Sequence, residues 1–248
     1  MDDLALQLRD VVVSYGGLNA VDGVSMTVHR SQRWAVIGPN GAGKTTLFKT
    51  ISGEVKVASG AVCLRGRDIT SLPPYRRARM GIGRTYQITN LFPDLTVAET
   101  VALAVLRRGK GKWRAWWPLR MRGELAERVD EALNQVRLAD RRTSRADELS
   151  HGEQRQLELA LAVATAPDLL MLDEPAAGLT ASERTLLTDL ISGLPRDITL
   201  LMIEHDIEMA FGLADRVLCM DNGVAIAEGT PNEIRANEDV QAVYLRAD

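Results

Sequence analysis

The sequence predicts an α/β protein whose parallel-sheet core carries an antiparallel β flank and an inserted α-helical subdomain. Three observations lead to this fold class. Short apolar runs at residues 34–37, 169–172 and 199–203 are typical of strands buried on both faces. Residues 4–30 alternate between apolar and polar and contain a Gly-Gly turn, which favours antiparallel strands. From about residue 91 to residue 166, apolar residues instead recur at helical spacing.

These patterns predict one domain over residues 1–248. Its α/β core comprises residues 1–89 and 160–248, and its helical insertion comprises residues 90–159. No internal repeat or low-complexity linker divides the chain. We therefore expect one continuous core interrupted by one insertion.

The expected elements follow one another along the chain. The expected strands are residues 4–30 in several pieces, 34–37, 61–64, 169–172, 199–203, 217–220 and 224–227. The expected helices are residues 43–53, 95–106, 124–138, 157–166, 183–194 and 207–214, with polar-faced helices in residues 232–245. The sequence Asp221-Asn222-Gly223 predicts a tight hairpin between the last two strands.

Composition excludes several protein classes. A chain of 248 residues with 46% hydrophobic and 25% charged residues is not disordered, collagenous or a disulfide scaffold. A net charge of -3 provides no overall basic field for nucleic acid. Cys63 and Cys219 fit buried thiols in a reducing compartment. Because the chain has no signal-like start and no run of about 20 apolar residues, we expect it in the cytosol.

A phosphate-binding motif lies between a predicted strand and a predicted helix. The residues Gly38-Pro39-Asn40-Gly41-Ala42-Gly43-Lys44-Thr45 match the pattern G-x-x-x-x-G-K-S/T. Its backbone N–H groups can surround phosphate oxygens, Lys44 can reach the β- and γ-phosphates, and the Thr45 hydroxyl can ligate Mg²⁺. The alternative is a glycine-rich turn with one exposed lysine, but both spacing and flanking context favour the phosphate loop.

An acidic pair, Asp173 and Glu174, follows the buried strand at residues 169–172. Ligands in open α/β sheets bind at the carboxyl ends of strands. Asp173 would then face Mg²⁺, and Glu174 could act as the general base for an attacking water. The alternative is a strand that ends in polar residues before Pro175.

A third motif precedes an apolar helix. In Leu149-Ser150-His151-Gly152-Glu153-Gln154, Ser150 and Glu153 form a capping box, which alone indicates only a helix start. Together and in this order, the three motifs resemble the phosphate loop, signature and acidic strand of ATP-binding-cassette (ABC) ATPases. The resemblance covers essentially the whole chain. It implies a RecA-like phosphate-loop NTPase fold, and it implies that the protein hydrolyses ATP with Mg²⁺.

The resemblance also implies roles for residues that carry little signal alone. Tyr15 occupies the place of an adenine-stacking aromatic, and His205 that of a switch histidine at the γ-phosphate. Gln87 matches a lid glutamine that contributes to catalysis and, with Thr45 and Asp173, to the Mg²⁺ site. The implied ATP-binding residues are Tyr15, Gly38, Pro39, Asn40, Gly41, Ala42, Gly43, Lys44, Thr45, Thr46, Ser150 and Gly152.

Within this family, the chain resembles the ATP-binding subunits of importers for branched-chain amino acids. The segments that carry this likeness are Val21-Asp22-Gly23-Val24-Ser25, Arg84-Thr85-Tyr86-Gln87, Leu91-Phe92-Pro93-Asp94-Leu95-Thr96-Val97 and Glu174-Pro175-Ala176-Ala177-Gly178-Leu179. Similar ATPases serve importers of urea, short amides and aromatic acids. An exporter or lipid-extraction ATPase and a soluble cassette of DNA repair or translation are further alternatives.

The resemblance implies a peripheral subunit at the cytoplasmic face of the inner membrane. Its implied partners are membrane-spanning permease subunits, a second cassette ATPase of the same or a similar sequence and, indirectly, an extracytoplasmic solute-binding protein. Nucleic acid is not among them. Each of two ATP molecules would lie between one chain's phosphate loop and the other chain's signature helix.

The chain departs from the common family pattern at three positions. His151 and Glu153 replace the third and fifth residues of the usual signature Leu-Ser-Gly-Gly-Gln, and Thr180 stands where aspartate is frequent. A negative Glu153 near phosphate is unfavourable unless it turns back on its own helix start, as the capping box predicts.

A basic segment interrupts the insertion. Residues 107–122 contain seven basic residues, no acidic ones, and three of the four tryptophans: Trp113, Trp116 and Trp117. Such a composition suits a membrane interface beside a permease. A solvated loop whose tryptophans fold back on the insertion is favoured over this hypothesis, because runs of charged residues are usually solvated.

Overall fold

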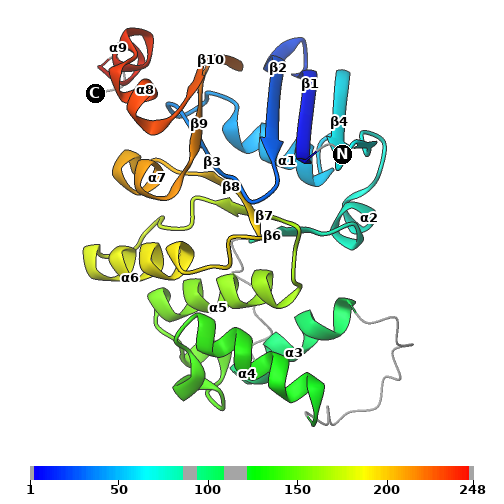
Figure 1. Ribbon diagram of the computed structural model, residues 1–248, viewed down its shortest axis with the longest axis vertical. Helices are drawn as coiled ribbons and strands as arrows, with labels where there is room; N and C mark the ends of the chain where they lie inside the picture. Colours follow the sequence, from blue (N-terminus) through cyan, green and yellow to red (C-terminus); the bar gives the residue numbers. More distant parts are fainter. Residues whose placement is uncertain (1–2, 86–93, 109–121, 246–248) are drawn as a thin grey trace. The chain divides into compact units, whose positions relative to one another are not determined.

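The computed structural model describes residues 3–85, 94–108 and 122–245. These residues form two compact units (Figure 1). The first unit combines Met1–Arg84, Asp168–Pro175 and Pro195–Asp248, and the second combines Thr85–Pro167 and Ala176–Leu194. Each unit is therefore built from segments that are far apart in the sequence.

An antiparallel sheet forms one layer of the first unit. Its strand order is β2-β1-β4-β5, with β1 at Leu4–Tyr15, β2 at Leu18–His29, β4 at Ser59–Leu64 and β5 at Arg67–Asp68. Strand β1 pairs antiparallel with both β2 and β4. Leu6, Leu8, Val11 and Val13 of β1 are all buried. The predicted antiparallel flank is thus confirmed.

A six-stranded, mainly parallel sheet forms the centre of the first unit. Its order is β10-β9-β3-β8-β7-β6, with β3 at Arg33–Ile37, β6 at Ile82–Arg84, β7 at Leu169–Asp173, β8 at Thr199–Ile203, β9 at Arg216–Asp221 and β10 at Val224–Gly229. The strands β3, β8, β7 and β6 run parallel, as does β9 beside β3, whereas β10 returns antiparallel to β9. All residues of β3 and β8 are buried, as their continuous apolar character predicts.

The helices of the first unit are α1 at Lys44–Ser52, α2 at Pro74–Arg79, α7 at Ile207–Leu213, α8 at Pro231–Ala236 and α9 at Glu238–Leu245. Helix α1 contacts β2 of the antiparallel sheet and β7 of the parallel sheet. Its apolar residues Leu47, Phe48 and Ile51 are fully buried in the core. The amino end of α1 is consequently held near the carboxyl end of β3, to which the loop of residues 38–43 joins it.

The second unit is helical. It contains α3 at Val97–Arg108, α4 at Glu124–Gln135, α5 at His151–Ala164 and α6 at Ala181–Ser192, with short 3-10 turns η1 at Ala139–Arg141 and η2 at Ala146–Glu148. Helices α3, α4 and α5 contact one another, and α6 contacts α5. This packing groups α6 with the helical unit, whereas the sequence analysis placed residues 160–248 in the core.

Several short elements, among them strand β6 and helix α2, were not predicted from the sequence. Strand β6 has three residues, of which Gly83 has no side chain, and it joins the sheet only through parallel pairing with β7. Helix α2 has six residues beginning at Pro74. Neither is long enough to have a recognisable period. None of the helices in the part of the chain that the structure describes is long and apolar enough to cross a membrane.

Candidate functional site

The loop between β3 and α1 is shaped by glycines that no larger residue can replace. Gly38 has a φ of 144°, and a Cβ atom there would lie 2.1 Å from the carbonyl oxygen of Met220. Gly43 has a φ of 96°, and a Cβ atom there would lie 2.3 Å from the carbonyl oxygen of Ala20. No side chain caps the start of α1. The loop therefore presents the free backbone N–H groups of a helix amino end, which suits an anion.

Lys44 lies folded over this loop. Its Nζ atom donates hydrogen bonds to the carbonyl oxygens of Gly38, at 2.7 Å, and Pro39, at 2.8 Å. The residue is 5% exposed, and burial lowers the pKa of its ammonium group, while the charges of Glu174 and Asp173 act in the opposite direction. The structure thus brings the loop lysine and both predicted carboxylates into one electrostatic environment.

Two of the three predicted catalytic side chains and the phosphate loop follow the carboxyl ends of three neighbouring strands. The loop follows β3, His205 follows β8, and Glu174 follows β7, and these strands are adjacent in the sheet. Glu174 has a φ of 48°, a left-handed conformation that is rare outside glycine. Its backbone N–H donates to the carbonyl of Ile203 at 3.0 Å. A strained backbone at this position holds the Glu174 carboxylate at the edge of the sheet.

Glu174 and His205 contact each other directly. The Nε2 atom of His205 lies 2.6 Å from Oε1 of Glu174, and both side chains keep partial exposure, at 43% and 28%. The backbone N–H groups of His205 and Asp206 both donate to the carboxylate of Glu204, which is 3% exposed. Sequence reasoning missed this role of Glu204, which orients the turn that carries His205.

Asp173 is held by an arginine that the sequence analysis did not single out. Arg84, at the end of β6, pairs with Oδ2 of Asp173 at 2.8 Å and with Oε1 of Glu54 at 2.7 Å. It also donates to Oγ of Ser52 at 2.8 Å. The Arg84 side chain is 6% exposed. One buried guanidinium therefore ties the end of α1 to the end of β7.

We expect Arg84→Met to lower the free energy of unfolding by about 1.5–3 kcal/mol, the range for hydrogen bonds to charged groups, because two partly buried carboxylates lose this partner. Urea unfolding followed by circular dichroism measures this change. The matched control is Arg65→Met, which removes a more exposed pair with Asp168 and should change stability by less than about 1 kcal/mol. Equal effects of the two substitutions would show that Arg84 acts only as a surface ion pair.

The donor set at this edge suits Mg²⁺ better than a softer metal. Thr45 offers an exposed hydroxyl at the start of α1, and Asp173 offers carboxylate oxygens at the end of β7. Residues 3–85, 94–108 and 122–245 contain no cluster of three or more His, Cys, Asp or Glu side chains that could hold a metal. One carboxylate and one hydroxyl fit Mg²⁺, since it is commonly completed by waters and substrate phosphates.

The remaining residues predicted for the first unit are less constrained. Tyr15 ends β1 and is 52% exposed, which leaves its aromatic face accessible. Thr46 lies in the first turn of α1 and accepts a hydrogen bond from Thr50 through its carbonyl oxygen. Gln87 lies outside the described residues, as does most of the basic tryptophan segment.

Both cysteines are free and buried, as expected. Cys219 lies on β9, and burial raises the pKa of its thiol to about 12. Thiolate chemistry is therefore disfavoured there.

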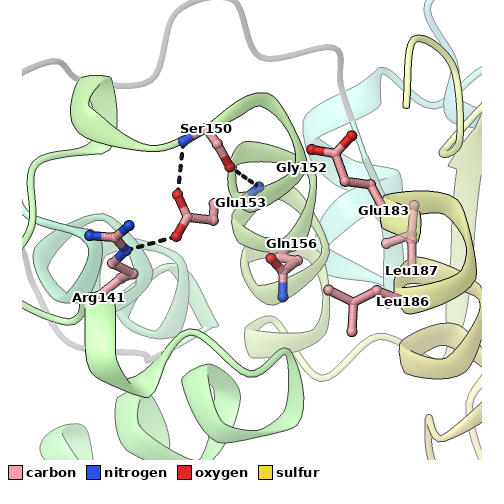
Figure 2. A pocket seen from close by; sticks show the side chains of 8 residues that line it. All are labelled: Arg141, Ser150, Gly152, Glu153, Gln156, Glu183, Leu186 and Leu187. Atoms are coloured by element: carbon pink, nitrogen blue, oxygen red, sulfur yellow. Dashed lines mark hydrogen bonds and ion pairs between the residues drawn. The ribbon is translucent and has the colours of Figure 1, made fainter. Parts of the chain in front are cut away.

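The signature residues lie at the amino end of α5 in the second unit. Ser150 is the N-cap, and its Oγ atom accepts a hydrogen bond from the N–H of Glu153 at 3.3 Å. The Glu153 carboxylate returns to the N–H of Ser150 at 2.8 Å and pairs with Nε of Arg141 at 2.7 Å (Figure 2). The predicted capping box is confirmed, and Glu153 does turn back on its own helix start. Gly152 is buried beside it.

The ionisation of Glu153 follows from these contacts. Burial acts to raise the pKa of its carboxyl group, but the hydrogen bonds from Ser150 and Arg141 outweigh burial, so that the pKa lies below its ordinary value. The carboxylate is therefore charged at neutral pH. Any anion that approaches the amino end of α5 meets this charge together with that of its Arg141 partner.

A second capping box lies beside the first. Thr180 is the N-cap of α6, and its N–H and hydroxyl both donate to the carboxylate of Glu183, at 2.9 and 2.7 Å. The other side of Glu183 faces Gly152, where a Cβ atom would lie 2.5 Å from Oε1. Thr180 thus has a local structural role in this chain, in the position where the family often has aspartate.

Between α5, α6 and η1 lies a cavity of about 300 Å³. Figure 2 shows its lining, which consists of Arg141, Ser150, Gly152, Glu153, Gln156, Glu183, Leu186 and Leu187. Two carboxylates and one guanidinium thus face the same space as the signature residues. Arg141 was missed by sequence reasoning, because no periodic pattern links it to Glu153 twelve residues later.

Comparison with known proteins gives consistent results. Residues 21–177 match the family described as ABC transporter, and residues 226–245 match the family described as branched-chain amino acid ATP-binding cassette transporter. The chain is 38% identical, over 252 aligned residues and 99% of each protein, to the high-affinity branched-chain amino acid transport ATP-binding protein LivG of Salmonella typhimurium. It is 37% identical, over 97% of each protein, to the corresponding protein BraF of Pseudomonas aeruginosa.

Solved structures agree with this likeness. The ADP conformation of an ATP-binding cassette of an ABC transporter superposes with a TM-score of 0.86 at 29% identity, over 98% of each chain. A nucleotide-free cassette from an ABC transporter superposes with a TM-score of 0.84 at 29% identity, over 97% of this chain and 98% of the other. The similarity therefore extends over nearly the whole length of each of these proteins.

Proposed function

The chain belongs to the ABC transporter family and is an ATP-binding cassette ATPase, and from this premise we propose that it energises an importer of branched-chain amino acids or a related small polar solute. Two features support the proposed substrate class. The carboxyl-terminal residues 226–245 match the family described as branched-chain amino acid ATP-binding cassette transporter. LivG and BraF, whose names state branched-chain amino acid transport, align with the chain over nearly their full length. Urea, amide and aromatic-acid importers remain the nearest alternatives.

The observation that carries the proposed chemistry is the convergence of Lys44, Glu174 and His205 at the carboxyl ends of adjacent strands. In this proposal, the backbone of residues 38–46 and the Lys44 ammonium bind the phosphates of ATP, and Tyr15 stacks on adenine. Thr45 and Asp173 would hold Mg²⁺, with Gln87 as a further ligand. When bound, this ion neutralises charge on the β- and γ-phosphates.

Glu174 acts as the general base in this mechanism. It accepts a proton from the water that attacks the γ-phosphorus, and the bond from that phosphorus to the bridging oxygen of ADP breaks. His205, in contact with the same carboxylate, orients it and faces the γ-phosphate. The products are ADP and inorganic phosphate, and the proton taken from the water is on Glu174.

The amino end of α5 completes the site of a second cassette. In the proposed dimer, Ser150 and Gly152 of one chain contact the γ-phosphate of ATP bound to the other, and hydrolysis removes this bridge. The dimer is attached to membrane-spanning permease subunits at the cytoplasmic face of the inner membrane. An extracytoplasmic solute-binding protein delivers the solute to these permeases.

The test is a pull-down of the tagged Glu174→Gln chain from detergent-solubilised native membranes with Mg-ATP, followed by mass spectrometry. We expect two multi-span permease subunits and a second cassette ATPase. The same pull-down without nucleotide is the control for association that depends on ATP. Recovery of soluble partners alone, or of a lipid-transport complex, would overturn the importer while leaving the ATPase chemistry intact.

A further inference from the structure

Two carboxylates lie at the amino end of α5, which is unusual for a surface proposed to contact phosphate. Glu153 lies in the first turn of α5, and Glu183 reaches the same helix start from α6. Both carboxylates line the cavity that Ser150 and Gly152 also line (Figure 2). A carboxylate at a helix amino end stabilises the helix, but it repels a second anion that approaches the same N–H groups.

Arg141 is placed to offset this charge. Its Nε atom lies 2.7 Å from Oε1 of Glu153, while the other oxygen of Glu153 accepts the N–H of Ser150. The Arg141 side chain is 50% exposed and the Glu153 side chain 22% exposed. The pair is therefore accessible from the cavity, and its guanidinium is the cation that lines the cavity beside two carboxylates.

The turn that carries Arg141 is anchored to α5 itself. Gln156, one turn after Glu153, donates from its buried amide to the carbonyl of Val136 at 2.7 Å. Leu138, two residues after Val136, is buried, and its carbonyl accepts the N–H of Arg141 at 3.0 Å. The turn that carries Arg141 is therefore tied to the helix that carries Glu153, which keeps the two partners of the ion pair close together.

We propose that Arg141 is a positioning residue for the signature: it holds Glu153 turned back on the start of α5 and offsets its charge, so that Ser150 and Gly152 can face the γ-phosphate of ATP on a second cassette. This inference rests on the proposed function, because it requires α5 to meet that phosphate. The proposed role of Arg141 explains how a signature with glutamate at its fifth position can contact the γ-phosphate of ATP.

The test measures association that depends on ATP in the Glu174→Gln background, by sedimentation velocity with Mg-ATP, Mg-ADP or no nucleotide. The sample is the chain with the second cassette recovered in the pull-down, or the chain alone if it pairs with itself. Arg141→Ala is expected to weaken association with Mg-ATP by about fivefold, the size expected when a half-exposed charge pair is broken. The double variant Arg141→Ala, Glu153→Gln should recover the parental affinity, since it removes the unbalanced charge while keeping a capping side chain.

Two further measurements separate this role from a merely structural one. The defect of Arg141→Ala should shrink at about 1 M salt, where charges are screened beyond about 3 Å. Thermal unfolding of the nucleotide-free chain should be similar for all variants. The matched control is Arg145→Ala, which removes an arginine of similar exposure that pairs with Asp147 in the same unit, and it should associate like the parent.

The outcomes are distinguishable. If the Glu174→Gln parent itself shows no association with Mg-ATP, the proposed function fails, and the role of Arg141 fails with it. If the parent associates and Arg141→Ala matches Arg145→Ala, the role of Arg141 alone is overturned. A defect that Glu153→Gln does not rescue, or that persists unchanged at high salt, also contradicts the proposal.

Discussion

A Glu174→Gln chain is expected to bind ATP and to hydrolyse it at about one hundredth of the parental rate or less, the range for loss of a general base. Glutamine has nearly the same shape but cannot accept the proton of the attacking water. The left-handed backbone of Glu174 and its 2.6 Å contact with His205 place this one oxygen at the edge of the sheet, so that a neighbouring carboxylate cannot easily replace it.

Phosphate release under steady-state conditions measures turnover, and equilibrium binding of a fluorescent ATP analogue measures affinity. The matched control is Glu208→Gln, which makes the same chemical change at an exposed position on α7 and should hydrolyse ATP normally. Steady-state hydrolysis equal to that of the parent would remove Glu174 from the role of base. Loss of ATP binding would instead show that Glu174 holds the site together.

The second large effect is expected for Lys44→Ala, which should weaken ATP binding by about 10- to 100-fold. A hydrogen bond to a charged group contributes about 1.5–3 kcal/mol, and Lys44 can direct its donors at two phosphates. In the structure, these donors are taken by the carbonyl oxygens of Gly38 and Pro39. Phosphate oxygens are stronger acceptors because they are charged, so exchange of partners favours the nucleotide.

Isothermal titration calorimetry measures this affinity for ATP. Lys49→Ala is the matched control, because Lys49 lies on the same helix but is exposed and makes no part of the loop. It should bind ATP like the parent. Thermal unfolding must accompany both measurements, since removing Lys44 leaves two carbonyl groups without this donor. An unaltered affinity of a folded Lys44→Ala chain would contradict the assignment of the phosphate loop.

These two substitutions separate binding from turnover. Lys44→Ala acts before chemistry, by weakening the contact between loop and phosphate, whereas Glu174→Gln acts after ATP is bound. If either substitution abolished both ATP binding and ATP hydrolysis, the two residues would be needed for the folded structure of the site, and not for separate steps of the reaction.

Local features of the fold were predictable because their causes lie within a few residues. The sequence alone determined the strand, loop and helix around residues 38–45, the hairpin between β9 and β10, and the capping box of Ser150 and Glu153. In each, glycine conformation or a side chain three residues away decides the backbone. The resemblance to ABC ATPases was also carried by such short motifs.

Only the tertiary structure decided which distant groups meet. Arg84 pairs with Asp173, 89 residues away, through a three-residue strand with no period of its own. Arg141 meets Glu153 because the buried amide of Gln156 draws the turn after α4 onto α5. Burial of apolar surface brings distant chain segments together. Many arrangements of the same helices and strands could bury a similar apolar surface, so the sequence pattern alone does not select one of them. Residue spacing in the sequence therefore identifies the motifs, whereas tertiary packing determines which distant residues contact them and hold them in place.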